Sequence, residues 1–298
     1  MLNHRIDSEF LSRADENGRE IMKKRLMEKH GFTDVRVIGR SILSRPIEAL
    51  FIGDGKKYVT VLATHHALES ISANVAFLLA DTLLAHRESR MIKNVNCKLL
   101  LSKYCFVIVP CVNPDGVELR FNGACDSILS DRQIRMSGGD FSTWQANARG
   151  VDLNHNYDYR FFEYKRLEEE RGIYAGPTLF SGEYPESEPE VRSVANLIRV
   201  LSPIAIVSLH SQGEEIYAYP DTPSVGRCSS RLSALSGYAR ARSEGTAAYG
   251  GLCDYTGSLG TPSFTYELGR GTNPLDESQV PRIFARVAES ILLLPTFL

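Results

Sequence analysis

Two adjacent histidines, His65 and His66, stand ahead of Glu69 in the stretch THHALES, residues 64–70. They follow KYVTVLAT at 57–64, a nearly continuous β-branched and apolar run that is typical of a buried strand. Apolar residues at helical spacing come directly after them. Ligands collect at the carboxyl edge of α/β sheets, and a His and a Glu three positions apart can converge on one cation. The stretch therefore predicts either a metal site or a polar strand end that binds nothing.

A third ligand is needed, because a catalytic zinc usually takes three protein ligands from His and Glu and leaves one position for water. His210 is the natural candidate, since it ends the strand-like run PIAIVSLH and is followed by SQG. Spacing alone leaves both interpretations open, the metal site and two chance polar strand ends.

Composition bounds the kind of protein. The chain has 298 residues, 43% of them hydrophobic and 23% charged, with a formal net charge of −2, so neither nucleic acid nor an anionic membrane is expected as a partner. The first twenty residues are charged throughout, unlike a secretory signal, and no apolar run approaches the roughly 20 residues of a membrane helix. The six cysteines form no CxxC pair. We therefore expect a reduced, cytoplasmic protein with free thiols.

Strand-like and helix-like segments alternate along the chain. Strands are predicted at 57–64, 98–110, 203–209 and 263–266, and helices at 70–83, 187–201 and 283–291. The Ser-x-x-Glu pattern at 187–190 is a helix-start signal, 122–148 is expected to be a surface loop, and 165–172 a solvated charged face. This alternation predicts an α/β fold with a mixed, mostly parallel sheet covered on both faces. We expect one domain over 1–298, with 1–34 as a helical lead-in.

Five motifs occur in a fixed order: H-x-x-E at 66–69, NPDG at 113–116, RGVDLN at 149–154, LHSQGEE at 209–215 and SFTYELGRGTNPL at 263–275. Together they resemble the zinc carboxypeptidase family, typified by carboxypeptidase A, from about residue 35 to the end. The resemblance implies an eight-stranded mixed sheet flanked by helices on both faces. It also implies a zinc metallopeptidase that hydrolyses an amide bond by metal-activated water. NPDG is interpreted as structural turn chemistry.

The resemblance also implies roles for single residues. By position, His66, Glu69 and His210 are the ligands of one zinc per chain, which leaves His65 over. Glu267 matches the family's general base, which takes a proton from water and delivers it to the leaving amine. Its apolar strand neighbours should raise its pKa. Asp152 matches the carboxylate that orients the first ligating histidine.

The sequence departs from the family where the substrate is held. The family's D-x-N is usually followed by arginine, and this Asn–Arg pair clamps a C-terminal carboxylate. Here the pair is Asn154 and His155, and a neutral imidazole cannot form arginine's bidentate fork. We expect this pair to hydrogen-bond a substrate amide or carboxylate less tightly. Gln145 stands where the family has a second arginine, whose charge Arg149 could supply. For the family's mobile tyrosine, Tyr249 is preferred to Tyr255.

These departures, with HSQGEEIY and GPTLFSGEYPESEPE, look like the γ-D-glutamyl-diamino acid peptidases. Members of that branch cut bacterial peptidoglycan stem peptides between D-glutamate and diaminopimelate. The predicted partner is thus a peptide or muropeptide. A diaminopimelate-type residue carries an extra amine and carboxylate on its side chain, and we expect Glu214, or else Glu215, to receive its ammonium group.

Other functions stay open at this point. The nearest is an ordinary metallocarboxypeptidase that releases C-terminal amino acids, and the next a desuccinylase- or aspartoacylase-like N-acyl amino acid hydrolase. A catalytically inactive binding protein would lack part of the ligand set or Glu267. A cysteine hydrolase that pairs a thiol with His155 is disfavoured, because no cysteine lies in a motif suited to activate it. Oligomeric state does not follow from the sequence.

Overall fold

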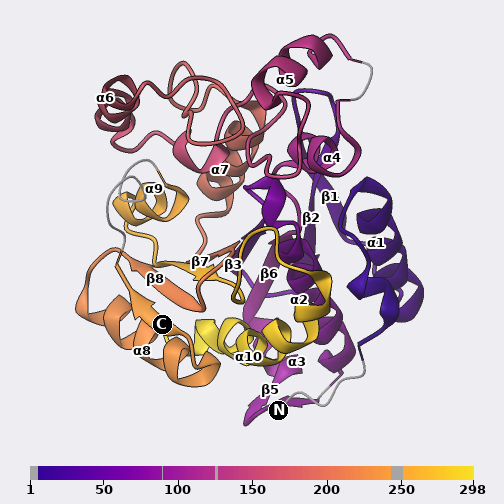
Figure 1. Cartoon of the computed structure of the whole chain (residues 1–298). Coiled ribbons are helices and arrows are strands. Elements are labelled where there is room, and N and C mark those ends of the chain that lie inside the picture. The colour runs from indigo at the N-terminus through magenta and orange to yellow at the C-terminus, as the bar shows by residue number, and fades with distance from the viewer. Residues whose placement is uncertain (1–5, 89, 125–126, 243–250) are drawn as a thin grey trace.

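The computed structural model describes residues 6–88, 90–124, 127–242 and 251–298. Its centre is an eight-stranded mixed sheet with strand order β1-β2-β6-β3-β7-β10-β8-β9 (Figure 1). The strands are β1 (Val35–Arg40), β2 (Pro46–Ile52), β3 (Lys57–Ala63), β6 (Tyr104–Val109), β7 (Ala205–His210), β8 (Glu215–Tyr219), β9 (Ala239–Ala241) and β10 (Ser263–Glu267). β6, β3, β7 and β10 run parallel, whereas β2 and β8 run antiparallel to β6 and β10. The predicted eight-stranded mixed sheet is confirmed.

Helices cover both faces of this sheet (Figure 1). The larger core packs one face against α1 (Glu16–His30), α2 (Ile71–His86), α8 (Pro223–Ser236) and α10 (Val280–Leu293). The second core packs the other face against α7 (Pro189–Leu201) and α9 (Leu252–Ser258). The remaining helices are α3 (Cys97–Lys103), α4 (Pro114–Asn122), α5 (Ser130–Ser137) and α6 (Phe161–Arg171), and a small ribbon pairs β4 (Met91–Ile92) with β5 (Val95–Asn96).

α2 is the helix predicted from apolar spacing after THHALES. Every residue from Ile71 to Leu84 is buried, not just one face. A helix that is apolar nearly all round must be covered on all sides, and α1, α10 and the sheet provide that cover. Because α2 is fixed in this way, the short turn between β3 and α2 has a rigid element at each end.

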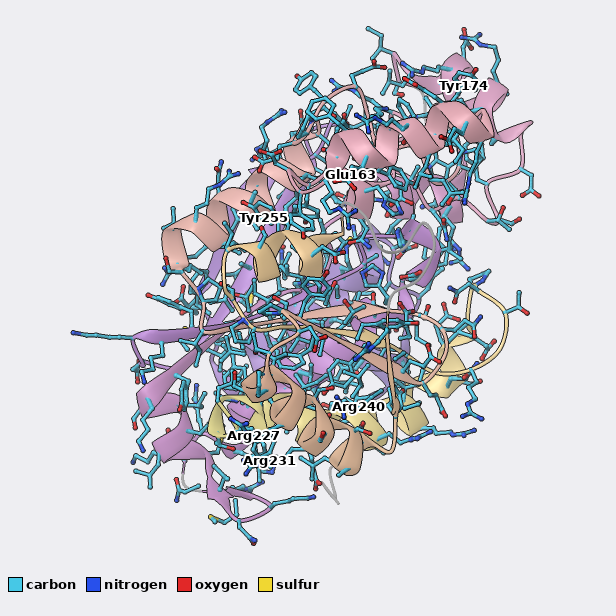
Figure 2. The ribbon with its side chains drawn as sticks, turned by 90° about the vertical axis from the view of Figure 1, so that its left-hand side faces the viewer. Glu163, Tyr174, Arg227, Arg231, Arg240 and Tyr255 are labelled. Atoms are coloured by element: carbon cyan, nitrogen blue, oxygen red, sulfur yellow. The ribbon has the colours of Figure 1, made fainter. Side chains whose placement is uncertain are left out.

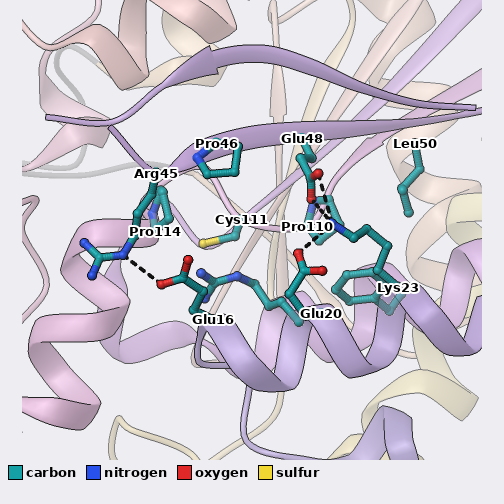
Figure 3. Close-up of a pocket in the computed structure, with 12 residues that line it drawn as sticks. Glu16, Glu20, Lys23, Arg45, Pro46, Glu48, Leu50, Pro110, Cys111 and Pro114 are labelled. Carbon is teal, nitrogen blue, oxygen red and sulfur yellow. Dashed lines mark hydrogen bonds and ion pairs between the residues drawn. The ribbon is translucent and has the colours of Figure 1, made fainter. Parts of the chain in front are cut away.

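The lead-in contains α1, which is tied to the sheet by ion pairs (Figure 3). Lys23 lies between Glu20 and Glu48 of β2, with its Nζ 2.8 Å from Glu48 Oε2. Arg45 contacts Glu16 at 3.0 Å. A pocket of about 40 Å³ remains between α1 and β2. The helical lead-in thus packs on the same sheet as the rest of the chain.

The strand predicted at 98–110 is half helix. α3 occupies its first part, and β6 begins at Tyr104. The Asn96 side chain accepts a hydrogen bond from the Leu99 backbone N–H at 3.1 Å and so caps α3. The prediction was wrong here because a short apolar run such as KLLL has no distinct period, and the cap decides its conformation.

Two further local expectations need correction. The stretch 122–148 was expected to be a loop, but it includes α5, which ends at Gly138 in the left-handed region (φ 63°). The helix near 187 begins one residue later than the Ser-x-x-Glu pattern indicated, with Glu188 as N-cap and Pro189 in the first turn. Ser187 bonds the Glu188 carboxylate instead of a backbone N–H. Among the described helices, none is long and apolar enough to cross a membrane.

Candidate metal centre

The ends of three parallel strands bring the candidate residues to one edge of the sheet. β3 leads into His66, β7 ends at His210 and β10 ends at Glu267. In the parallel pairing of β7 and β10, Glu267 lies opposite His210. This is the carboxyl edge at which α/β sheets bind ligands.

Thr64 makes the turn that carries the chain from β3 to the ligands. It is fully buried and has a φ of 57°, a conformation that a β-branched residue rarely adopts. Its backbone N–H donates to Ser72 Oγ at 2.9 Å, and its hydroxyl lies 3.2 Å from the Pro110 carbonyl. Ser72 also donates to the Glu69 carbonyl at 2.7 Å. These bonds from the first turn of α2 fix the ligand-bearing turn.

His66, Glu69 and His210 converge with their metal-binding atoms within 4.8 Å of one another. The two Glu69 oxygens lie 3.0 Å from His66 Nδ1 and 3.0 Å from His210 Nδ1. The two Nδ1 atoms are 3.3 Å apart. Two imidazole nitrogens and a carboxylate that meet at one point form the donor set of a divalent cation such as zinc.

Asp152 holds the first of these ligands. It is buried, and its Oδ1 lies 3.1 Å from His66 Nε2 while its Oδ2 accepts a bond from the Leu179 N–H at 3.3 Å. Burial disfavours its charge, but His66 and His155 lower the pKa of Asp152 below its usual range. Burial likewise disfavours charged His66, yet Glu69 and Asp152 raise the pKa of His66 well above its usual value. The two carboxylates thus favour a positive charge here.

A cation fits this site better than a proton does, because both Nδ1 atoms point at the same place. With Nε2 of His66 bonded to Asp152, Nδ1 is left for a metal. His65 belongs elsewhere: it is fully buried, and its Nε2 lies 2.9 Å from the Tyr157 hydroxyl. Burial and the neighbouring histidines lower the pKa of His65 well below its usual value. The predicted trio is therefore the metal set, and His65 is a packed neutral histidine.

Glu267 lies at the same edge and is half-buried. Burial raises the pKa of Glu267 above its usual value, and the nearby charges of Glu69 and Glu215 add to the shift. His210 acts in the opposite direction. A carboxylate with a raised pKa beside a metal site can both accept and return a proton near neutral pH.

Asn154 and His155 occupy a one-turn helix that follows Asp152. Asn154 is half-buried, and its Oδ1 accepts a hydrogen bond from the Leu252 N–H at 3.2 Å, which ties it to the start of α9. His155 is buried, and its ring stacks on Tyr164 of α6 with centroids 4.1 Å apart and planes at 9°. The expected contact of His155 with substrate does not fit this placement, because its ring packs against a helix.

Gln145 lies close to the ligand turn through its backbone. Its carbonyl accepts a bond from the Ala67 N–H at 2.9 Å, and its side chain is bonded to Thr178. The Arg149 guanidinium lies 3.7 Å from the Glu188 carboxylate. Both residues line a pocket with Arg132, and that pocket includes none of the three metal ligands. The structure therefore brings Gln145 next to the ligands and pairs Arg149 with a carboxylate outside the ligand cluster.

Glu214 was expected to meet a substrate ammonium group, and the structure places it otherwise. Its carboxylate is buried and lies 2.8 Å from Arg270 and 2.5 Å from Arg286. Glu214 stands just before β8, at a φ of 57°. Glu215 is instead the residue opposite Glu267, and it accepts a hydrogen bond from the Tyr217 hydroxyl at 2.8 Å. The expectation for Glu214 was wrong, because its charge is already matched by arginine.

The two tyrosine candidates for the mobile position have different outcomes. Tyr249 lies outside the described residues. Tyr255 is buried in α9 and stacks on Tyr157 with centroids 5.5 Å apart, and the Arg199 guanidinium lies 5.9 Å from its ring centroid. Tyr255 is therefore a core residue.

Two positioning residues were not found from the sequence. Asn113 of NPDG accepts from the Gly116 N–H at the start of α4 and donates to the carbonyls of His65, Gln145 and Ala146 at 3.0–3.2 Å. Asn273 donates to the Ser211 carbonyl at 2.6 Å and so joins the loops after β7 and β10. NPDG and GRGTNPL carried these residues, but their spacing does not show which carbonyls they reach.

The cysteines of the described residues are free thiols, and four of the five are buried. Burial raises the pKa of Cys97 to about 11 and that of Cys253 to about 12. A nucleophilic cysteine needs a lowered thiol pKa. These thiols therefore do not support a cysteine hydrolase.

Comparison with known proteins adds to this geometry. The family model described as zinc carboxypeptidase matches residues 19–285. The γ-D-glutamyl-L-diamino acid endopeptidase 1 of Lysinibacillus sphaericus is 33% identical over 270 residues, which cover 88% of this chain and 67% of that protein. Carboxypeptidase A6 of Mus musculus is 29% identical over 176 residues, 57% of this chain and 35% of that protein.

The fold has counterparts among solved structures. The crystal structure of thrombin-activatable fibrinolysis inhibitor superimposes with a TM-score of 0.76 at 20% sequence identity. The match covers 98% of this chain and 75% of that chain. At this identity the similarity establishes a shared fold, and the functional residues must be judged from the site itself.

Proposed function

The chain belongs to the zinc carboxypeptidase family, and from this premise we propose that it cleaves the bond between γ-D-glutamate and a diaminopimelate-type residue in peptidoglycan stem peptides. At the coarser level it is a zinc metallopeptidase that acts on peptides, with one zinc held by His66, Glu69 and His210. The finer assignment concerns which amide bond is the substrate.

The placement of His155 carries the proposal. A carboxypeptidase that releases C-terminal residues needs a guanidinium to grip the terminal carboxylate, and here the corresponding side chain is an imidazole stacked inside on Tyr164. The relative named as a γ-D-glutamyl-diamino acid endopeptidase supports the same direction, since it is similar over 88% of this chain. The carboxypeptidase A6 similarity spans 57%.

The chain's own residues perform the proton transfers in this proposal. Zinc, when bound, supplies a Lewis acid that polarises the scissile carbonyl and acidifies water. Glu267 accepts a proton from the attacking water and delivers it to the leaving amine, a double task suited to its raised pKa. Asp152 keeps the His66 ring oriented and its Nε2–H bonded. Burial of Glu69 and His210 keeps the polar groups of this edge fixed before substrate arrives.

The test uses zinc-loaded full-length protein and a panel of substrates. The panel holds muropeptides with a γ-D-glutamyl–diaminopimelate bond, the same peptides with an α-linked glutamate, and plain peptides with a free C-terminus. Mass spectrometry of the products identifies the bond that is cut. We expect cleavage at the γ-D-glutamyl bond and little release of C-terminal residues. Preferential trimming of plain peptides would contradict the proposal and favour the simple carboxypeptidase.

A further inference from the structure

A pocket of about 530 Å³ lies at the β8 end of the sheet, between α8, α9 and the start of α6. This volume falls in the range of small-molecule sites. Tyr217 and Tyr219 of β8, Asp254 of α9 and Arg160 form part of its lining. Figure 2 shows Glu163 on α6 and Tyr255 on α9 on one side of the sheet, with Arg240 on the side of α8.

β8 links this pocket to the candidate active site, because its first residue pairs with Glu267 and its later residues line the pocket. In the antiparallel pairing with β10, Glu215 lies opposite Glu267 and Tyr217 lies opposite Thr265. Side chains two residues apart on a strand share a face, so Tyr217 and Tyr219 point to the same face as Glu267, with Tyr217 about 7 Å further along. The hydrogen bond from Tyr217 to Glu215 joins the pocket wall to the neighbour of Glu267.

A second connection runs through Asn154. Its Oδ1 holds the Leu252 N–H at the start of α9. Asp254 lies in the first turn of this helix, and a Cβ at Gly251 would come within 2.9 Å of its Oδ2 and 3.9 Å of Asn154 Nδ2. Asn154, which matches a substrate-binding residue of the family, is therefore next to the helix turn that carries Asp254.

The charged residues of the pocket are Asp221, Asp254, Arg160, Arg240 and Arg242. Arg242 pairs with Asp221, and Arg240 donates to Ser230 of α8, so we consider Asp254 and Arg160 as the ligand-binding pair. Asp254 is buried, accepts a hydrogen bond from Tyr219, and has its pKa raised to about 6 by burial, which the nearby Arg160 partly offsets. A buried carboxylate of this kind is stabilised by a cationic ligand. Arg160 is 38% exposed and pairs with Glu163, which is 48% exposed. Exposed pairs of this kind are weak and can exchange for a ligand.

We propose that this pocket receives the side-chain end of a diaminopimelate-type residue, with Asp254 binding its ammonium group and Arg160 binding its carboxylate. The inference rests on the proposed function and narrows it. A lysine-type diamino acid offers the ammonium group without the carboxylate, so it would bind Asp254 and gain nothing from Arg160, which would keep its pairing with Glu163. The pocket thus selects diaminopimelate over lysine in the residue that follows γ-D-glutamate.

Two peptides that differ only in that residue, meso-diaminopimelate or L-lysine, test the inference with zinc-loaded enzyme. We expect wild type to prefer the diaminopimelate peptide by at least about tenfold in kcat/KM, the size typical of a charged hydrogen bond. Arg160→Gln should lose this preference, mainly through KM, and leave the lysine peptide unaffected. Asp254→Asn should lower kcat/KM for both peptides, because both carry the ammonium group. Arg166→Gln, an exposed arginine on α6, is the matched control and should match wild type.

Reversing the charge of Arg160 gives a second, independent test that leaves the buried Asp254 unchanged. Arg160→Glu should favour the lysine peptide, because its new carboxylate repels that of diaminopimelate. Zinc content and circular dichroism show whether each variant is folded. Equal rates on both peptides for wild type, or equal losses on both for Arg160→Gln, would overturn the pocket assignment while the γ-D-glutamyl specificity stands. Failure to cut either peptide, with trimming of plain peptides, would overturn the proposed function instead.

Discussion

His66 and His210 each supply one nitrogen to the metal set, so removing either should release zinc. Wild-type protein should hold one zinc per chain. We expect His66→Ala and His210→Ala to lower zinc affinity by more than roughly 100-fold, the upper range for losing a residue that merely orients a ligand. Metal analysis after dialysis against buffered zinc measures this. His86→Ala, a substitution at the end of α2, should retain zinc. Undiminished zinc in either ligand variant would contradict the assignment.

Glu267 can be tested separately from the metal. Glu267→Gln preserves the shape of the side chain and removes its ability to take a proton. If Glu267 is the general base, this variant should keep its zinc and lose activity by about 100-fold or more, since positioned acid–base catalysis contributes 10²–10⁴. Zinc content and kcat on the preferred substrate are the two measurements. Retention of most of the activity would place the base elsewhere.

Single residues differ in how far the sequence could predict them. Strand ends and spacing made His66, Glu69 and His210 candidates, because parallel strands bring their carboxyl ends to one edge. The family resemblance was needed to choose the metal site over two chance polar strand ends. Glu214 and Glu215 could not be separated, because which one faces Glu267 depends on the positive φ of Glu214. A backbone conformation of this kind leaves no signal when the residue is not glycine.

At the scale of elements, the junction of α1, β2 and α4 depends on one buried carboxylate. Asp115, the acid of NPDG, is fully buried, lies 2.8 Å from Arg45 and accepts the Leu43 N–H at 2.8 Å. Arg45→Ala leaves that charge unpaired and should lower the free energy of unfolding by about 3 kcal/mol. Urea denaturation measures the loss. Arg36→Ala removes an exposed pair with Asp34 and should cost under about 1 kcal/mol. Equal effects would show that Asp115 is not held by Arg45.

Long apolar elements were predictable and short ones were not. β3 and α2 follow from a β-branched run and a helical repeat that tertiary packing reinforces. α3 and α5 span seven and eight residues, too few for their period to be distinguished from strand or loop. Their ends are set by Asn96 and Gly138, so caps rather than periodicity would have located them.

At the scale of the whole molecule, stability should depend on pH through Glu190. This residue is fully buried in the first turn of α7, and burial raises its pKa from 4.5 to about 8. Between those values the folded protein keeps a proton that the unfolded chain releases. The free energy of unfolding therefore falls as pH rises from about 4.5 to 8, by up to about 1.4 kcal/mol per pH unit.

Glu190→Gln removes the titrating carboxyl and should flatten the pH dependence of the free energy of unfolding. The variant should gain most stability over wild type near pH 8. Urea denaturation at a series of pH values follows it. Glu170→Gln, a substitution at an exposed position on α6, should show the same pH dependence of stability as wild type. An unchanged slope in Glu190→Gln would show that the carboxyl titrates normally in the folded protein.

The arrangement of the whole molecule was predictable in class but not in detail. Alternating strands and helices indicate a covered, mostly parallel sheet, and the motif order indicates the family. The pocket beside β8 depends on how β8, α8, α9 and Arg160 meet. Arg160 is more than fifty residues away from these three elements in the chain, and its position beside them is a result of packing that no local pattern encodes.

The conformation of Thr64 links the metal to the fold. A buried threonine at a φ of 57° costs on the order of 1–3 kcal/mol, and only the native contacts with Ser72 and Pro110 hold it there. The unfolded chain therefore does not present His66 and Glu69 in ligating geometry, and zinc binds the native state alone. By mass action, free zinc above its dissociation constant adds directly to the free energy of unfolding. Zinc supply thus controls how long the enzyme survives as well as whether it is active.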